Sequence, residues 1–363
     1  MPRTISRPDT SSAAQPRALV RGRGQDYRIE FDARPAYDFI LSLVTIDGLE
    51  YDLLAEDRTW LERSRSALSP ERRQDLNDLF GEAKGGFGHG LTIMPVLHPE
   101  MQTARDLVTL VATMPTRQLT RELAGDGFGV PVMELIERAL DGDEAAFAEL
   151  PAHLSDQECA PVVDFLRAPT TWIDKLRGLL ADWLVAFEPI EPRIAEIQHR
   201  DVDLRRADRE ALAPAELIER TTGGLRWLPE PGIQRVILAP SYFGRPYNNI
   251  SSGSDFRLFA YPVHEDALGR ADELAPPEAV LRLYRALGDP SRLRILRLLT
   301  DRDLYLTEIA QQMELSKPTV KHHLAALRAA GLVTVTDEGN MTYYSLRRAR
   351  VAEAGPELLR FLH

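Results

Sequence analysis

Residues 307–332 read TEIAQQMELSKPTVKHHLAALRAAGL, and this stretch decides the fold of the C-terminal part of the chain. Thr307 is a suitable N-cap for a short helix over Glu308–Met313, whose apolar side chains recur at helical spacing. Glu314-Leu315 follows directly and leaves room only for a tight turn. A second helix must therefore begin within two residues of the end of the first.

Ser316 is the N-cap expected for that second helix, which runs from Lys317 to about Ala330. Gly331 is expected to end it, because glycine readily takes the left-handed conformation that follows a helix. Two short helices joined by a tight turn predict a helix-turn-helix.

The second helix has one apolar face, formed by Val320, Leu324 and Leu327 at positions i, i+4 and i+7. His323 lies beside this face and is expected to pack inward. The polar side chains project from the other faces, and they belong to Ser316, Lys317, Thr319, Lys321 and His322. Such a helix suits DNA, because its N-terminal turn can enter the major groove while the helix dipole favours phosphate.

The flanking segments complete a winged helix. Asp289-Pro290 begins one helix, with Asp as N-cap and Pro as first residue, and Ala279–Gly288 forms another before it. Leu332–Thr336 and Met341–Leu346 alternate around a short turn, which predicts a hairpin, the wing.

Several ordered blocks of this segment resemble the ArsR family of winged-helix repressors; they read ALGDPSRLRIL (286–296), LSKPTVKHHL (315–324), LRAAGLV (327–333) and YYSL (343–346). The resemblance covers about Pro277–Leu346. It implies a homodimeric bacterial transcriptional regulator that binds an imperfect palindrome. By position, Ser316, Lys317, Thr319, Lys321 and His322 match the residues that family members direct at DNA, although each could instead be a solvated surface residue.

The sequence departs from the family pattern in the wing. Many members carry Arg or Lys there, whereas this tip is Asp-Glu-Gly-Asn at 337–340, whose carboxylates repel phosphate. Asn340 and Tyr343 remain as weaker candidates for DNA contact. The candidates for compensating cations are the basic N-terminal tail and three arginines just after the hairpin, Arg347, Arg348 and Arg350.

The second departure concerns metals. The thiol-based sensors of the family have paired cysteines at the start of the third helix, where this chain has Asp303–Glu308 without a thiol. The last helix, Ala352–His363, also lacks the paired ligands of the family's zinc site. Soft metals need sulfur or imidazole ligands, so we expect no metal and no cofactor.

The rest of the 363-residue chain has a different charge. Residues 274–363 carry a net charge of +3 and residues 1–25 carry +4, whereas residues 26–273 carry −18. We expect four parts: a disordered basic tail (1–25), an acidic and mainly helical N-terminal domain (26–262), a linker (263–276), and the winged helix-turn-helix domain (277–363). The absence of a signal peptide, of a long apolar run and of all but one cysteine, Cys159, favours the cytoplasm.

The pattern inside the N-terminal domain is helical from Pro35 to about Thr222. Helix signals include Ser69-Pro70 as a cap and Ser155–Glu158 as a capping box. Strands are expected over Tyr27–Phe31 and over 235–239 and 256–261, the last two joined by the turn-rich stretch 247–253.

Three functions remain open for this domain. A sensor could hold a small molecule among aromatic side chains, which are Trp227, Tyr242, Phe243, Tyr247, Phe256, Phe259 and Tyr261, although these could equally form an ordinary core. A structural module could dimerise or bind a protein partner. An enzyme has the least support: Gly85–Gly90 lacks the Lys-Ser/Thr of a phosphate loop and favours a flexible loop, and His89, His98 and His153 are scattered.

The sequence thus predicts a mainly α (α+β) protein of two domains. Its expected function is that of a bacterial ArsR-type regulator that binds operator DNA as a homodimer. It is expected to be a repressor relieved by a small non-metal ligand, not an enzyme.

Overall fold

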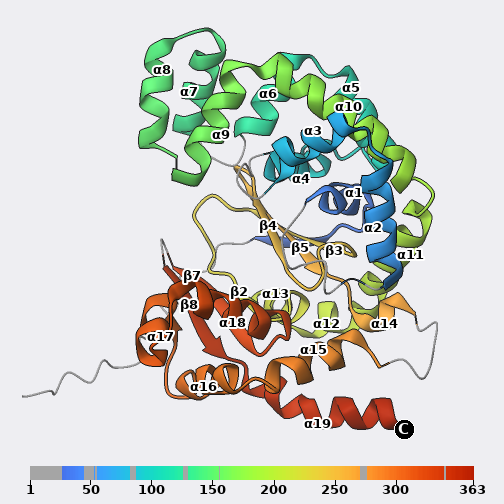
Figure 1. The fold of residues 1–363 in the computed structure, drawn as a ribbon, viewed down its shortest axis with the longest axis vertical. Helices are drawn as coiled ribbons and strands as arrows, with labels where there is room; N and C mark the ends of the chain where they lie inside the picture. The colour runs from blue at the N-terminus through green and yellow to red at the C-terminus, as the bar shows by residue number, and fades with distance from the viewer. Residues whose placement is uncertain are drawn as a thin grey trace, which may run out of the picture.

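The computed structural model describes residues 27–44, 53, 55–81, 87–125, 130–154, 156–269, 276–338 and 341–363. Figure 1 shows two units, a large N-terminal one in which helices surround a sheet and a smaller C-terminal one. The predicted class, mainly α with small β elements, is confirmed. The predicted basic tail, residues 1–25, lies outside the described residues.

The helices of the N-terminal unit follow one another with short connections, and they are α1 (Ala36–Leu43), α2 (Ala55–Ala67), α3 (Pro70–Phe80), α4 (Phe87–Leu97), α5 (Ala104–Thr113), α6 (Thr116–Gly125), α7 (Val130–Leu140), α8 (Glu144–Glu149), α9 (Asp156–Arg167), α10 (Pro169–Phe187), α11 (Glu191–Leu204), α12 (Arg206–Ala211), α13 (Pro214–Thr221) and α14 (Glu265–Leu268). Helix α10 packs against α3, α5 and α6. Its apolar stripe, which includes Leu176 and Trp183, is buried as the spacing predicts. Burial of this stripe from water stabilises the helical layer.

Local sequence signals account for several helix ends. The Ser69 hydroxyl accepts a hydrogen bond from the Arg72 amide at 3.1 Å and Pro70 is the first residue of α3, so this predicted start is confirmed. Helix α1 ends at Leu43, and residues 45–52 after it lie outside the described residues. The predicted capping residue Ser155 also lies outside them.

The first sheet has the strand order β1-β3-β5-β4, formed by β1 (Arg28–Phe31), β3 (Arg235–Ser241), β5 (Phe256–Pro262) and β4 (Asn249–Ser252). Strands β1, β3 and β5 are parallel, and β4 is antiparallel to β5. The turn-rich stretch expected between two strands therefore contains a strand of its own. Short, polar β4 pairs at the sheet edge, where a strand needs little apolar sequence.

Two apolar clusters cover the two faces of this sheet. Ile93 and Val96 of α4 pack on one face against Ile237 and Leu258. Ile218 of α13 packs on the other against strand residues that include Val236 and Phe259. The aromatic residues predicted as candidates for a ligand pocket include five that are buried in such clusters: Tyr242, Phe243, Phe256, Phe259 and Tyr261.

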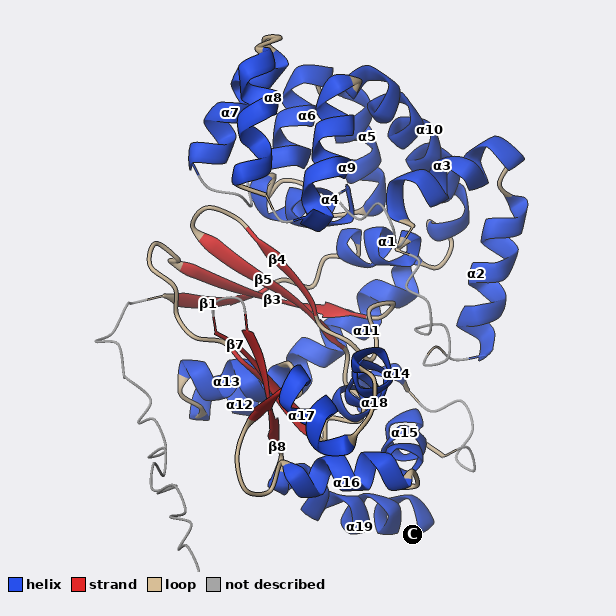
Figure 2. Ribbon diagram, turned by 60° about the vertical axis from the view of Figure 1, so that its left-hand side comes forward, coloured by secondary structure: helices blue, strands red, loops and turns tan. Residues whose placement is uncertain are grey.

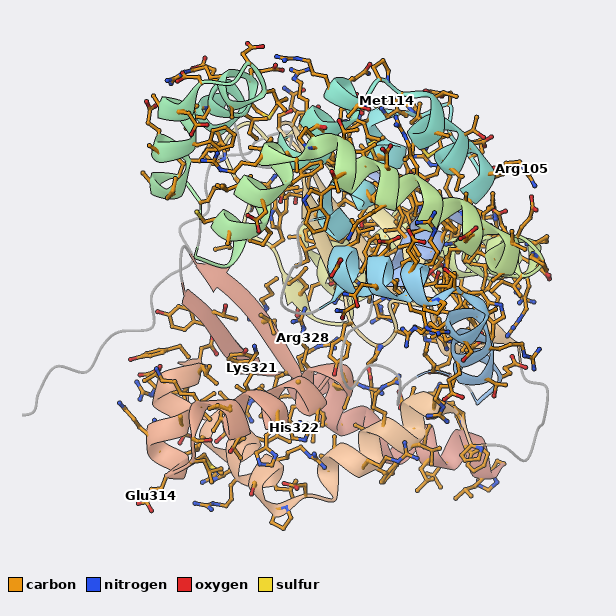
Figure 3. All side chains as sticks on the ribbon, turned by 45° about the horizontal axis from the view of Figure 1, so that its top comes forward. Arg105, Met114, Glu314, Lys321, His322 and Arg328 are labelled. Atoms are coloured by element: carbon orange, nitrogen blue, oxygen red, sulfur yellow. The ribbon has the colours of Figure 1, made fainter. Side chains whose placement is uncertain are left out.

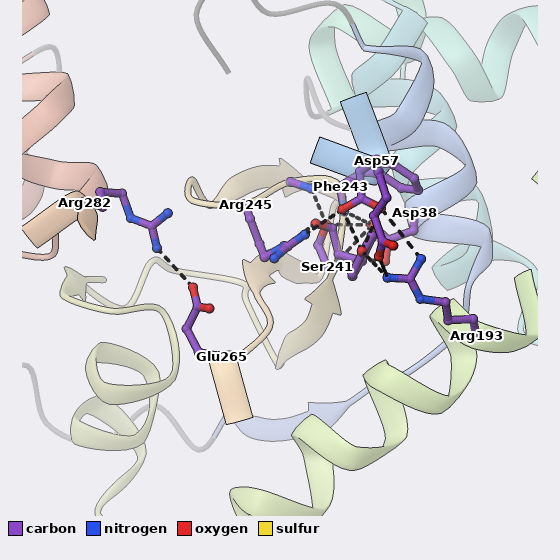
Figure 4. A network of polar contacts seen from close by, with 11 residues as sticks. Asp38, Asp57, Arg193, Ser241, Phe243, Arg245, Glu265 and Arg282 are labelled. Atoms are coloured by element: carbon purple, nitrogen blue, oxygen red, sulfur yellow. Dashed lines mark hydrogen bonds and ion pairs between the residues drawn. The ribbon is translucent and has the colours of Figure 1, made fainter. Parts of the chain in front are cut away.

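A buried carboxylate fixes the chain where β3 ends. The Asp38 side chain of α1 is fully buried and accepts hydrogen bonds from the amides of Tyr242 and Phe243 at 2.8 Å, from the Ser241 hydroxyl at 2.9 Å and from the Gln198 amide at 2.8 Å. Figure 4 shows this cluster beside the contacts of Asp57. Because each lone-pair direction is used, a charge can be buried here.

Two predictions for the N-terminal unit need correction. Helix α4 begins at Phe87, so part of the glycine-rich stretch 85–90 is helical rather than a loop; a Cβ at Gly90 would lie 2.3 Å from the Leu123 carbonyl oxygen, so glycine permits α4 to approach α6. The predicted linker 263–276 also begins too early. Val263 and Ala267 are buried in the main core, and α14 lies within the predicted linker.

The C-terminal unit contains α15 (Glu278–Leu287), α16 (Pro290–Leu298), β6 (Leu304–Tyr305), α17 (Leu306–Met313), α18 (Lys317–Ala329), β7 (Val333–Glu338), β8 (Met341–Leu346) and α19 (Arg348–Leu362). The helices and the β7–β8 hairpin have the order expected of a winged helix (Figure 2). The sheet order is β2-β7-β8-β6, and its first strand, β2 (Leu225–Arg226), comes from the N-terminal part of the chain.

Candidate nucleic-acid interface

The turn between α17 and α18 is built from a left-handed residue and a cap. Glu314 has φ of 56°, which reverses the chain after α17, and the Leu315 amide bonds to the Ala310 carbonyl. The Ser316 hydroxyl then accepts the Thr319 amide at 3.3 Å, so the predicted cap of α18 is confirmed. These local bonds set the angle at which α18 leaves α17.

Helix α17 starts earlier than expected. Its first residue is Leu306, and the Glu308 carboxylate accepts the Tyr305 amide at 3.2 Å. The predicted cap Thr307 therefore lies inside the helix. Glutamate three residues into a helix satisfies a free amide as a capping hydroxyl would, which explains the two-residue error.

The inner face of α18 is anchored as the spacing predicts. Val320, Leu324 and Leu327 are at most 1% exposed and pack in one cluster with residues such as Ile309 and Met313 of α17. Gly331 has φ of 68° and ends the helix. An anchored inner face fixes which side chains α18 presents outward.

The structure brings together the residues predicted to read DNA. Ser316, Lys317, Thr319, Lys321 and His322 are all exposed in the N-terminal half of α18 and at its cap. The hydroxyls of Ser316 and Thr319 lie 2.7 Å apart and share a hydrogen bond, so the cap uses part of their bonding capacity.

The two flanks of α18 differ. Figure 3 shows Lys321 and Arg328 on the flank turned toward the N-terminal unit and His322 on the other. Arg328 is absent from the residues predicted to contact DNA, although its spacing of seven from Lys321 places both on one side of a helix. Helix α18 thus carries cations along one flank and an imidazole on the other.

His323 lies inward, as its place beside the apolar face predicts. Its side chain is 14% exposed, and its Nδ1 lies 4.0 Å from the carboxylate of Asp289. Asp289 caps α16 by accepting the Arg292 amide at 2.9 Å, and this bond lowers the pKa of the carboxyl. His323 therefore lies between α18 and the start of α16.

The structure describes one of the two predicted wing contacts. The Tyr343 ring of β8 packs edge-on against Tyr305, with the ring centroids 6.2 Å apart. Asn340 lies outside the described residues. Of these two predicted contacts, the structure therefore describes the side chain of Tyr343.

The structure gives Arg347 a place different from the predicted one. Its Nη1 donates to the carbonyl oxygens of Gly223 and Gly331, and burial lowers the pKa of the guanidinium. In this arrangement Arg347 joins the winged helix to the N-terminal unit. Its role as a DNA contact stays a prediction.

Other candidate sites have ordinary structural partners. His98 bonds to Glu122 at 2.8 Å, and Cys159 is a half-buried free thiol. Over the described ranges, His, Cys, Asp and Glu side chains form no group of three that could hold a metal ion. No helix in the same ranges is long and apolar enough to cross a membrane.

Residues 289–335 match the family model described as bacterial regulatory protein, arsR family, and these residues span α16 to the first half of β7. The HTH-type transcriptional regulator CmtR of Mycobacterium tuberculosis is 42% identical over 81 residues, which are 22% of this chain and 69% of CmtR. The chain belongs to the ArsR family.

Two other proteins are similar to this chain over about the same share of its length. The transcriptional repressor SdpR of Bacillus subtilis is 32% identical over 81 residues, 22% of this chain and 90% of SdpR. Reduced HlyU from Vibrio cholerae is 34% identical and aligns with 23% of this chain and 88% of its own, with a TM-score of 0.20. The ArsR-family chain is a transcriptional regulator whose winged helix is its DNA-binding part.

Proposed function

We propose that this protein is a homodimeric bacterial repressor that binds a two-fold symmetric operator. The observation that carries the proposal is the exposed set Ser316, Lys317, Thr319, Lys321 and His322 on α18. A recognition helix reads base edges with residues of its N-terminal half, and these five lie there.

Each side chain has a proposed role set by its chemistry. Lys321 donates to a phosphate or to a guanine edge, and Lys317 strengthens the positive end of α18. His322 donates to or accepts from a base. Tyr343 and Asn340 are weaker contacts from the wing, whose acidic tip is less suited to phosphate than a basic wing.

The proposed dimer has support from α19. Helix α19 rests on α15, where the Tyr284 hydroxyl donates to the Ala354 carbonyl at 2.9 Å. The same helix leaves large apolar residues exposed: Val351 (39%), Leu359 (55%) and Leu362 (63%). A second copy covering this face would remove apolar surface from water.

Repression and relief by a small non-metal molecule complete the proposal. Repression has support from the name of SdpR, a transcriptional repressor. The attachment of the N-terminal unit to the winged helix supports an effector role for that unit, because a ligand there could shift the equilibrium between two states of the protein. We propose a cytoplasmic protein without enzymatic activity.

Selection from a random duplex library tests the DNA-binding proposal. The full-length protein should enrich a two-fold symmetric motif whose half-sites lie about one helical turn, roughly 10 base pairs, apart. The variant Lys321→Ala/His322→Ala should enrich no such motif, whereas Arg63→Ala, an exposed cation on α2, should behave as the wild type. Equal enrichment by both variants would contradict the proposed reading surface.

Native mass spectrometry of the purified protein, followed by denaturing measurement, tests the dimer and the effector. The expected species has twice the mass of the 40.8 kDa chain. A small extra mass that disappears on denaturation identifies a molecule to titrate against DNA binding. A purely monomeric protein would contradict two-fold operator recognition.

A further inference from the structure

A short strand of the N-terminal part extends the sheet of the winged helix. In β2, Leu225 pairs with Val335 and Arg226 with Thr336, parallel to β7. Figure 1 shows β2 and α13 next to the C-terminal unit. Strand β7 forms one side of the wing, so the N-terminal unit is hydrogen-bonded to an element expected to lie near DNA.

A second contact fastens the same place. Arg347 follows β8 and donates to the Gly223 carbonyl, just before β2. Gly224 has φ of 118°, and a Cβ there would lie 2.7 Å from the Arg347 Cδ. Only glycine leaves room for this side chain in this backbone conformation.

The strand is also held from the N-terminal side. Leu225 is 6% exposed and packs with Ile218 of α13 in the cluster under the first sheet. Arg226 pairs with Glu219 at 3.1 Å. Movement of β2 relative to α13 would disrupt this cluster, so β2 and the N-terminal unit move together.

A third contact joins the two units at the other end of the winged helix. Arg282 of α15 lies 3.5 Å from Glu265 of α14, with both side chains mostly buried (Figure 4). The winged helix is therefore held at its first helix and at its wing.

The charge of the attached unit opposes DNA. Residues 26–273 carry a net charge of −18, whereas the winged helix carries +3. The flank of α18 with Lys321 and Arg328 is turned toward this acidic unit. The negative charge of this unit would repel phosphates that approach the flank, and the repulsion is strongest at low salt, where screening is weak.

We infer that the β2–β7 pairing is an autoinhibitory contact: the docked arrangement binds DNA weakly, and β2 must leave β7 before the protein binds DNA tightly. This inference rests on the proposed DNA-binding function. The pairing consists of only two residue pairs. Such a small contact can open without unfolding either unit. A small molecule that favours the docked arrangement would weaken DNA binding and so relieve repression.

A disulfide lock tests the inference. Arg226 and Thr336 are paired, and the Cα atoms of adjacent strands lie within the range that a disulfide accepts. We would make Arg226→Cys/Thr336→Cys in a Cys159→Ser background and measure the Kd for a fluorescent 40-base-pair duplex of mixed sequence at low salt. The oxidised protein should bind at least fivefold more weakly than the same protein after reduction.

The controls separate the possible failures. The single variant Arg226→Cys should not respond to oxidation. Two thiols that fail to crosslink would contradict the docking, and a crosslinked protein that binds equally or more tightly would overturn the autoinhibition. If the reduced protein binds no duplex at all, the proposed function itself fails.

A second variant removes the contact instead of locking it. Gly224→Ala places a methyl group against Arg347 and should free β2, which faster amide exchange in β7 would report. The Gly224→Ala protein should bind the duplex at least threefold more tightly than the matched control Gly223→Ala. Gly223 also has a positive φ, 70°, but a Cβ added there would have no neighbour among the described residues within 4 Å, its chain neighbours apart. Freed β7 amides with unchanged or weaker DNA binding would overturn the inference.

Discussion

At the residue scale, Lys321 gives the most direct test of the interface. Its ammonium group is exposed and, among the described residues, has no ion-pair partner. Replacing Lys321 with Ala should weaken operator binding. If the side chain contacts a phosphate, the slope of log Kobs against log salt concentration should also become shallower by about one. Titration of the selected operator at several salt concentrations measures both effects.

The slope distinguishes two roles of this lysine. A weaker affinity with an unchanged slope and relaxed base preference would assign Lys321 to a base edge rather than to a phosphate. Arg63→Ala removes the same charge far from α18 and should change neither quantity. Unaltered binding by Lys321→Ala would contradict its place in the interface.

Asp38 gives a residue-scale prediction for the N-terminal unit. Burial raises the pKa of this carboxyl, while the hydrogen bonds from Tyr242, Phe243 and Ser241 oppose that rise. Asn in its place would point an amide group at some of these donors and leave them unsatisfied. The free energy of unfolding should fall by about 2–3 kcal/mol.

Tryptophan fluorescence during urea unfolding measures this change selectively. All four tryptophans of the chain lie before residue 228, so their signal reports the N-terminal unit. The exposed Asp164→Asn on α9 serves as the control and should leave the transition unchanged. An unchanged midpoint for Asp38→Asn would show that the buried bonds contribute little.

At the scale of elements, the helix-turn-helix could be predicted because its signals are local. The caps Asp289 and Ser316, the stop at Gly331 and the apolar spacing of α18 all act within a few residues of the element they define. The five exposed side chains of α18 were accessible to the same reasoning. Arg328 could have been found by its spacing, but it lies beyond the half of the helix where contacts are expected.

The pairing of β2 and the place of Arg347 could not be predicted. Strand β2 has two residues, too few to show any period, and its partner β7 lies more than a hundred positions later. The Gly223 carbonyl that holds Arg347 is 124 positions away. Propensity and periodicity describe neighbours along the chain, whereas these contacts depend on how two separately folded units meet.

Asp289 yields a pH-dependent prediction for α16. Its folded pKa is lowered, chiefly by the bond from the Arg292 amide, below the usual value of about 3.9. A lowered folded pKa contributes stability above the unfolded pKa, and this contribution is lost as the pH falls through the folded value. The wild type should therefore exceed Asp289→Asn in stability at pH 6 and lose this advantage below about pH 4.

Amide exchange in α16, compared between wild type and Asp289→Asn at each pH, measures the difference. Asn keeps a capping oxygen but cannot carry a charge, so it isolates the ionisation. Asp301 is exposed in the turn that follows α16, so Asp301→Asn provides a control with the same change of charge. A difference that persists unchanged at pH 3 would contradict the role of the carboxylate.

At the scale of the whole molecule, we propose that two interfaces determine how the winged helix meets DNA. In this proposal the contact with the N-terminal unit lowers the affinity of α18 for DNA, and a contact with a second copy supplies the second recognition helix. The first lies along β7 and at α15, whereas the exposed face of α19 is available for the second. Opening the first contact need not disturb the second, so affinity can change while the dimer persists.

The dimer is tested on α19. The variant Leu359→Glu/Leu362→Glu places two charges on the exposed apolar face, and desolvating them would oppose association. Sedimentation velocity should show a monomer of 40.8 kDa in place of a dimer, and operator affinity should fall by at least tenfold because only one recognition helix binds at a time.

Val185→Glu is the matched control, because Val185 is 75% exposed on α10, far from α19, and the change introduces the same side chain. It should leave both the sedimentation and the affinity unchanged. If Leu359→Glu/Leu362→Glu remains dimeric, α19 is not the dimer interface, and we would then expect the N-terminal unit to supply it. In that case the autoinhibitory contact and the dimer would belong to the same unit, and opening β2 would change the spacing of the two recognition helices as well as their access to DNA.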